Sequence, residues 1–361
     1  MSIQAILSGP HTHSKFSVTE TMIAVMVCLS PATAMGFYLF GWPAVFLFAV
    51  TIASALAAEA FCLVLARKSV MMHVTDGSAM LTGWLIAMTL PPWAPWWVGA
   101  VGAVIAIVVA KHVYGGLGQN LFNPAMVARA ILLVAFPVQM TSWVMPHAIG
   151  DPLSPNVPEA LAITFGRGPS VDALSGATTL SQVTAELSGG RTVPEVMAET
   201  FDLTSLAWGQ VSGSLGETSA LLLLLGGVML LAMRLISWHI PVAVLGSVAL
   251  LSGALHWVDP LSYPSPLWHL SSGALVLCAF FIATDYVTSP VSRMGKLIYG
   301  CGIGVLIVII RTFGAFPEGA AFAVLLMNGC APIIDEFTRP RIFGRTRKGA
   351  PMPLPKDTSH G

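Results

Sequence analysis

Charged residues are scarce in this chain of 361 residues: they make up 9%, whereas hydrophobic residues make up 55%. A soluble domain usually carries about a quarter charged residues. So small a polar fraction cannot cover a globule that faces water on all sides. The apolar residues also gather in runs close to the ~20 residues with which a helix crosses a bilayer. The sequence therefore predicts an all-α polytopic membrane protein.

The chain also lacks the cysteine and histidine spacings of metal sites. Its five cysteines stand singly inside apolar segments, with no C-x-x-C pair and no histidine-rich run beside them. This argues against an iron–sulfur cluster or a zinc site built by this chain alone. Each cysteine is predicted to be a small buried hydrophobic residue, although a cluster shared with a neighbouring subunit stays open.

The first twenty residues lack the basic start, apolar stretch and small-residue cleavage site of a signal peptide. The first apolar run is therefore expected to remain as the first helix, behind an N-terminal tail of residues 1–20. Ten spans are predicted in all, the third and fourth short and interrupted by prolines. Their approximate ranges are 21–40, 43–66, 76–90, 95–110, 123–144, 218–234, 239–256, 268–285, 296–311 and 318–335.

Basic residues are unevenly distributed around these spans. With the N-terminus in the cytoplasm, thirteen lysines and arginines fall on the cytoplasmic side and three on the other. The positive-inside bias favours that orientation, in a bacterial inner membrane. The basic tail at 336–361 is then cytoplasmic, where it suits anionic lipid or a protein partner better than nucleic acid. The long polar loop, 146–217, is expected in the periplasm.

Five predicted spans precede this loop, within 21–145, and five follow it, within 218–335. The two halves then enter the membrane from opposite sides, as inverted-topology repeats do. Short matches between the halves favour a repeat: residues 86–89 (IAMT) resemble 282–284 (IAT), and 122–124 (FNP) resemble 327–329 (MNG). The predicted fold is therefore about ten transmembrane helices in two inverted five-helix repeats.

The polar loop contains the sequence DALSGAT, from Asp172 to Thr178. The pattern D-x-x-S-G-A-T is the acceptor sequence that flavin transferases modify in bacterial respiratory subunits, by joining the phosphate of FMN to the last threonine. Gly176 and Ala177 leave the backbone open to a bulky phosphoryl donor, and the Ser175 hydroxyl can bond phosphate oxygens together with nearby N–H groups. Asp172 could order the turn or hold the metal ion of the transferase.

An ordinary small-residue turn is the alternative, and the four residues SGAT alone would favour it. Three observations favour flavin attachment instead: the aspartate at the matching offset, the position in the large hydrophilic loop, and the predicted periplasmic side. The sequence therefore predicts covalent FMN on Thr178.

Two further motifs extend this pattern to nearly the whole chain: KHVYGGLGQNLFNPA at 111–125, and MN at 327–328 followed by PIIDEFTRPR at 332–341. With them the sequence resembles the D subunits of Rnf complexes, which are ferredoxin:NAD oxidoreductases. It is similar also to the B subunits of sodium-translocating NADH:quinone reductases, which usually have a longer N-terminal extension. The resemblance implies a subunit that carries electrons through its FMN while the complex moves sodium ions or protons across the membrane.

The resemblance also implies the partners. They are a second subunit with covalent FMN, iron–sulfur subunits, and a flavin transferase for maturation. The quinone-reductase relatives imply a non-covalent riboflavin within the helices as well. This chain alone is expected to complete no reaction, and no catalytic residue or metal ligand is predicted in it. A quinone-reductase subunit of the B type, a urea-channel-like solute transporter and a scaffold without cofactor remain alternatives.

A glycine- and asparagine-rich stretch, 115–123, stands where the fifth predicted span begins. Irregular backbone at membrane depth is tolerated where it packs in protein or lines a polar cavity. Asn120, Asn123 and Arg129 could therefore face a flavin ring or an ion path. The alternative, which the sequence supports equally, is that these residues cap the start of the helix and that the glycines allow close packing.

Three carboxylates lie within or at the ends of predicted spans. Glu59 is well inside the second span, and Asp76 and Asp285 are at the ends of the third and eighth. Such residues are usually functional or paired. They are candidates for an ion path, Glu59 foremost. The alternative for Glu59 is a salt bridge or hydrogen bond to a neighbouring helix or subunit.

Overall fold

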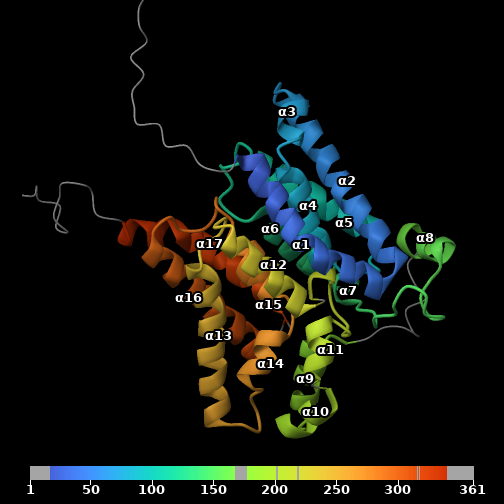
Figure 1. Ribbon diagram of the computed structural model, residues 1–361, viewed down its shortest axis with the longest axis vertical. Helices are drawn as coiled ribbons and strands as arrows, with labels where there is room; N and C mark the ends of the chain where they lie inside the picture. Colours follow the sequence, from blue (N-terminus) through green and yellow to red (C-terminus); the bar gives the residue numbers. More distant parts are fainter. Residues whose placement is uncertain are drawn as a thin grey trace, which may run out of the picture.

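The structure is a computed structural model of the chain, and it describes residues 17–166, 177–200, 202–217, 219–314, 316 and 318–339. Within these ranges every regular element is a helix (Figure 1). Five helices are long and apolar enough to cross a bilayer: α1 (Val18–Phe40), α2 (Trp42–Leu65), α13 (His239–Val258), α16 (Arg293–Phe313) and α17 (Ala320–Phe337). The prediction of a helical polytopic membrane protein is confirmed.

Shorter apolar helices correspond to four more of the predicted spans. They are α4 (Ser78–Thr89), α5 (Trp96–Val104) with its π-helical continuation η1 (Ile105–His112), α6 (Pro124–Ala135) and α12 (Ala220–Ala232). The short helix α3 (Val70–Val74) links α2 to α4.

Two predicted spans are not continuous helices, and each break has a local cause. The fifth, predicted over 123–144, ends at Ala135 and resumes as α7 (Pro137–Thr141), because Pro137 has no N–H for a helical hydrogen bond. The eighth, predicted over 268–285, is divided into α14 (Pro266–Ser271), α15 (Leu275–Leu277) and the π-helical η4 (Cys278–Ile282). Gly273 separates α14 from α15 with a φ of 70°, which a side chain would disfavour. Each of these two predicted spans is therefore divided into shorter helices.

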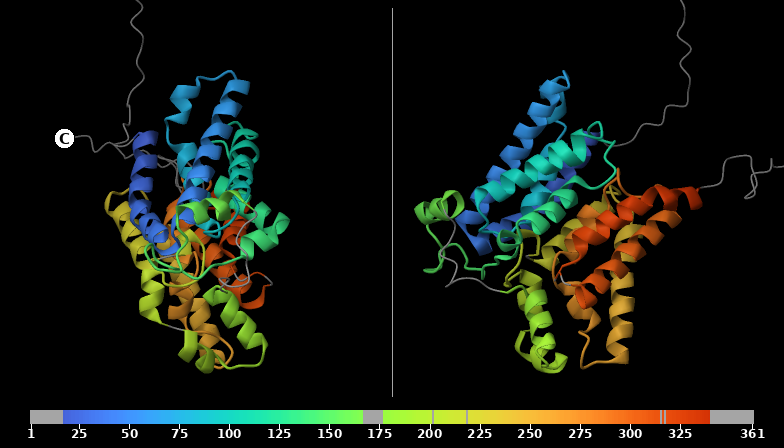
Figure 2. Two further views of the ribbon diagram at one scale, coloured as in Figure 1. Left: turned by 90° about the vertical axis from the view of Figure 1, so that its right-hand side faces the viewer. Right: turned by 180° about the vertical axis from the view of Figure 1, so that it is seen from behind.

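The helices form two groups, α1–α7 and α12–α17, which lie side by side (Figure 1, Figure 2). One hydrophobic core joins them, because buried residues of α1, α4 and α6 belong to the same cluster as those of α12, α16 and α17. Three cysteines are buried as predicted, but Cys301 and Cys330 are exposed. The prediction was wrong for these two, since they lie on outward faces of α16 and α17, where an apolar side chain suits a lipid surface.

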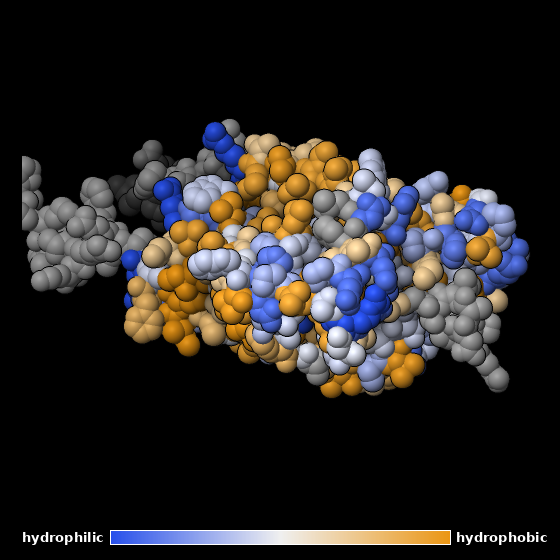
Figure 3. Space-filling model, turned by 90° about the horizontal axis from the view of Figure 1, so that it is seen from below, coloured by the Kyte–Doolittle hydropathy of each residue, from blue (hydrophilic) through white to orange (hydrophobic). Residues whose placement is uncertain are grey.

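The polar segment between the two groups folds into short helices. They are α8 (Val157–Phe165), α9 (Thr179–Ser188), α10 (Val193–Thr200), α11 (Leu203–Trp208) and the 3-10 turn η3 (Leu215–Glu217). A small apolar cluster of Leu180, Val183, Val196 and Trp268 fixes α9 and α10 against α14. Seen from this end of the molecule, hydrophilic surface gathers beside apolar flanks (Figure 3).

Glycines bring helices together within both groups. A Cβ on Gly304 of α16 would lie 2.6 Å from the Val244 carbonyl oxygen of α13, and a Cβ on Gly99 of α5 would collide with Thr51 Oγ1 of α2. In lipid, where burial of apolar surface gives helices little reason to associate, such close contacts between small residues are what holds them together. The helix pairs α2–α5 and α13–α16 are therefore both held together by close contacts at glycines.

We expect Gly304→Ala to lower the thermal stability of the purified protein in detergent, because the Val244 backbone cannot move away from the new methyl group. Overpacking of this kind typically destabilises by about 1–3 kcal/mol. Gly246→Ala on α13 is the matched control, since a Cβ there meets nothing within 4 Å. Its melting temperature should stay level or rise. Equal losses in the two variants would contradict the packing argument.

Candidate functional site

Thr178 is the N-cap of α9 and is almost fully buried, with 5% of its surface exposed. Its Oγ1 accepts a hydrogen bond from the Ser181 N–H at 3.1 Å and lies 2.8 Å from the Ser181 hydroxyl. The N-terminus of a helix presents free N–H groups and a partial positive charge, which together favour phosphate. The hydroxyl predicted to accept FMN thus lies where a phosphate would be stabilised.

The other predicted residues of this motif are less defined. Ala177 is exposed directly before the cap. Asp172, Ser175 and Gly176 lie outside the described residues. The geometry of the site is therefore built from Thr178 and the elements against which α9 packs.

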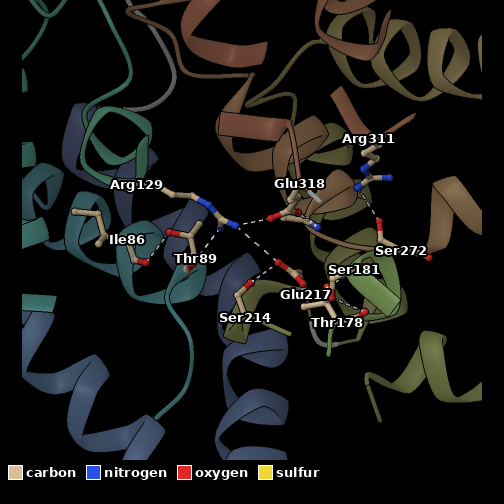
Figure 4. A network of polar contacts seen from close by, with 11 residues as sticks. Ile86, Thr89, Arg129, Thr178, Ser181, Ser214, Glu217, Ser272, Arg311 and Glu318 are labelled. Atoms are coloured by element: carbon tan, nitrogen blue, oxygen red, sulfur yellow. Dashed lines mark hydrogen bonds and ion pairs between the residues drawn. The ribbon is translucent and has the colours of Figure 1, made fainter. Parts of the chain in front are cut away.

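The start of α9 meets the turn between α14 and α15. A Cβ on Gly273 would lie 2.7 Å from Leu180 Cδ1 of α9, 2.8 Å from Arg311 Nη2 of α16, and 3.1 Å from Glu318 Oε1. Two charged side chains and the helix that begins at Thr178 thus converge on one glycine. Figure 4 shows Arg311, Glu318 and Thr178 in this region.

Arg129 of α6 lies in a buried ionic network that joins the two helix groups (Figure 4). It pairs with Glu318, donates to the Thr89 carbonyl oxygen at 3.0 Å, and lies 3.9 Å from Glu217. Glu318 also accepts a hydrogen bond from the Ala274 N–H at 2.5 Å. Removal of one partner from such a buried pair typically destabilises by about 3–5 kcal/mol, because it leaves the other charge without compensation. Arg129 therefore holds the groups together, whatever else it contacts.

A second site lies between the helix groups, in a cavity of about 110 Å³. Asn120, Asn123 and Asp285 line it together with Lys111 and apolar side chains of α1, α4 and η4. Asn123 also caps α6, since its Oδ1 accepts from the Ala125 N–H at 3.1 Å. The helix-entry cap, one of the two predictions for this asparagine, is present, and the same residue lines the cavity.

Glu59 is paired rather than free. Its Oε2 lies 2.9 Å from Lys111 Nζ and 3.0 Å from His112 Nε2, although the histidine contact lacks hydrogen-bond geometry. Lys111 donates further to the Ser78 hydroxyl at 2.9 Å, and Asp76 accepts from the Ser78 N–H at 2.7 Å. Both basic residues belong to η1, and π-helical segments are frequent at functional sites. The salt bridge to a neighbouring helix, one of the two predictions for Glu59, is present.

Sequence reasoning missed four charged residues that these sites use: Lys111, Glu217, Arg311 and Glu318. Lys111 and Arg311 were counted only as markers of orientation. Each of the four stands at the edge of an apolar run, where burial of a charge is unfavourable unless it is paired. A charged residue at the edge of an apolar run was the signal available in the sequence, but it does not identify the residue with which the charge pairs.

Comparison with known proteins identifies relatives of this chain over nearly its whole length. The family model described as "NQR2, RnfD, RnfE family" matches residues 5–344. The chain is 50% identical over 342 residues to the D subunit of the ion-translocating oxidoreductase complex of Stutzerimonas stutzeri, covering 95% of this chain and 96% of that protein. It is 46% identical over 347 residues to the protein of the same name from Halorhodospira halophila, covering 96% and 97%. It is 53% identical over 304 residues to that of Rhodobacter capsulatus, covering 84% of each. This chain belongs to the NQR2, RnfD, RnfE family.

Proposed function

We propose that this chain is the D subunit of an Rnf-type ion-translocating oxidoreductase and carries electrons through FMN bound covalently to Thr178. The observation that carries the proposal is that Thr178, the last residue of DALSGAT, is the N-cap of α9. A phosphate esterified there would face the free N–H groups of the first helical turn. Membership of the family supports the role in a complex that couples ferredoxin/NAD electron transfer to movement of sodium ions or protons.

The bound FMN would supply the redox chemistry, and the chain would hold it in place. The Ser181 N–H, which bonds Thr178 Oγ1, is available to an ester or phosphate oxygen. Leu180 and Val183 pack against Trp268 of α14, which ties the start of α9 to the helix core. The phosphate end of the flavin is thereby fixed relative to the membrane helices, and partner subunits with iron–sulfur centres and a second FMN complete the electron path.

A second, non-covalent flavin, riboflavin, is proposed for the cavity between the helix groups. The amides of Asn120 and Asn123 offer donors and acceptors to a ring edge, and Phe280 and Phe281 offer aromatic walls. A volume of about 110 Å³ means that the helix groups must separate somewhat to admit a whole ring.

The coupled ion is proposed to pass near the cluster of Glu59, Lys111 and His112, with Asp76 and Asp285 beside it. Glu59 is 3% exposed and pairs with Lys111, which also lines the cavity between the groups. A change of charge in that cavity would therefore change the electrostatic energy of the Lys111–Glu59 pair, because the separation is short and little water screens it.

The proposal also includes two inverted repeats, with the flavin loop in the periplasm and both termini in the cytoplasm. A similar turn in each half supports the repeats: a glycine with positive φ precedes α4 (Gly77, φ 83°), and another precedes α15 (Gly273, φ 70°). A buried cation from the next long helix bonds each of these turns: Lys111 reaches Ser78, and Arg311 reaches the Ser272 carbonyl oxygen. The uneven distribution of basic residues supports the orientation.

Thr178→Val should abolish covalent flavin while Thr179→Val, the adjacent control, keeps it. On a denaturing gel viewed under ultraviolet light, the wild-type band at 38.0 kDa is expected to fluoresce when cells contain the transferase. The valine at 178 removes the only side-chain oxygen at that position, so its band should be dark, with intact mass equal to the bare polypeptide. A dark wild-type band would refute the attachment.

Asn123→Asp is expected to lose the non-covalent flavin. Aspartate caps a helix as well as asparagine does, so α6 should remain folded while the amide donor to the ring is lost and a negative charge is added. Denaturing the purified protein and measuring flavin in the supernatant should give at least a several-fold reduction from the wild-type amount. If wild-type protein releases no flavin, or if Asn123→Asp and Asn120→Leu both release it undiminished, the cavity holds none.

A further inference from the structure

A second and larger cavity, of about 480 Å³, lies along α9 and belongs to none of the sites above. Its size falls within the range of about 300–1,000 Å³ that is usual for small-molecule sites. Six of the residues that form its wall are Val183, Thr184, Arg191, Trp268, His269 and Arg311. They come from α9, the turn after it, α14 and α16, and residues 261–264 complete the wall of this open cavity.

Three buried polar side chains at this wall carry atoms without a hydrogen-bond partner among the described residues. They are His269 Nδ1, Ser272 Oγ and Arg311 Nε. The three side chains are from 0 to 5% exposed. His269 and Arg311 line the cavity, and Ser272 is joined to Arg311 through its carbonyl oxygen. Buried polar groups are nearly always satisfied, and a ligand in the cavity would supply a partner for His269 Nδ1 and Arg311 Nε.

Arg311 also brings a positive charge to the cavity. Its guanidinium donates to the carbonyl oxygens of His269 and Ser272, each at 2.9 Å, and has no carboxylate within ion-pair distance in the described part of the chain. Glu318, across Gly273, is already paired with Arg129. The other arginine that lines the cavity, Arg191, already has an acidic partner. It donates a hydrogen bond to Glu199 at 2.8 Å, and this bond lowers the pKa of the Glu199 carboxyl. A buried cation without its own ion pair is unfavourable, and a ligand that can hold negative charge would relieve it.

The position of the cavity points to the group on Thr178 as that ligand. Thr184, on the cavity wall, is six residues beyond Thr178 in the same helix, which is about 9 Å along its axis. Leu180 lies between Thr178 and Thr184 on this helix. Its side chain lies close to Gly273, and the guanidinium of Arg311 lies close to the same glycine. A ligand tethered at Thr178 by a flexible sugar-alcohol chain therefore has to reach back along α9 to enter the cavity, where Trp268 is part of the wall.

We propose that this cavity receives the isoalloxazine ring of the flavin on Thr178, with Arg311 as the positioning residue that favours its reduced form. The inference rests on the attachment proposed above. When the ring takes up two electrons from a reductant and one proton from solvent, it gains one negative charge. A fixed guanidinium beside it stabilises that charge, and so raises the midpoint potential.

The first test compares Arg311→Met with Arg311→Lys in purified protein that carries covalent flavin, by reductive titration with dithionite followed by flavin absorbance. Arg311→Met is expected to shift the reduction equilibrium at least tenfold toward the oxidised form, which is about 30 mV for a two-electron couple. Arg311→Lys keeps a positive charge and should shift it much less. An unchanged potential in Arg311→Met would overturn the role of Arg311.

The second test does not depend on Arg311 and its hydrogen bonds. Thr184→Phe fills the cavity, whereas Ala185→Phe, one residue further on α9 and not on the cavity wall, is the matched control. Thr184→Phe should displace the ring and make its fluorescence several-fold more sensitive to quenching by iodide; Ala185→Phe should not. Equal quenching in both variants and wild type, with the flavin attached in all three, would overturn the ring site but leave the attachment standing. Wild-type protein without covalent flavin would overturn both proposals.

Discussion

The buried ion pair between Arg129 and Glu318 is the constraint on which the arrangement of this molecule depends. A buried arginine is unfavourable unless an acid or carbonyl oxygens satisfy it, so α6 packs where an acid from the second helix group reaches Arg129. Glu318 does so, and its other oxygen accepts from the Ala274 N–H beside Gly273. That turn touches Leu180 of α9. One pair thus connects the first helix group, the broken eighth span and the helix that begins at Thr178.

Broken helices create a second requirement, because backbone groups inside a bilayer must be satisfied by the protein. Here a buried cation lies at the break of the eighth span and another at the turn before α4. Arg311 donates to two carbonyl oxygens at the end of α14, and Lys111 donates to the side-chain hydroxyl of Ser78, the first residue of α4. Satisfying a turn in this way also brings a positive charge to a cavity wall, since Lys111 and Arg311 each line one. Structural necessity and an electrostatic environment suited to an electron carrier therefore come from the same residues.

Much of the fold could be predicted from the sequence. The features that could not be predicted depend on backbone angles and on packing between distant segments. The five long spans were predictable because apolar length alone decides them. The break at Gly273 was not, since a single glycine in an apolar run resembles any other small residue until its φ is known. At the candidate site, the Thr178 motif was visible as a local pattern. The partners of Arg129 were not, because Glu318 is 189 residues away along the chain and only packing brings them together.

Attachment of a phosphate to Thr178 would use the same oxygen that now caps α9. In the unmodified chain this oxygen accepts from the Ser181 N–H, so the helix start is complete without any cofactor. Esterification would replace a neutral cap by a phosphodiester, whose negative charge and free oxygens interact more strongly with the N–H groups and dipole of the first turn. The proposed modification would therefore reinforce the helix start. A site of this kind can fold first and receive its flavin afterwards, because the structure that holds the cofactor does not need the cofactor in order to form.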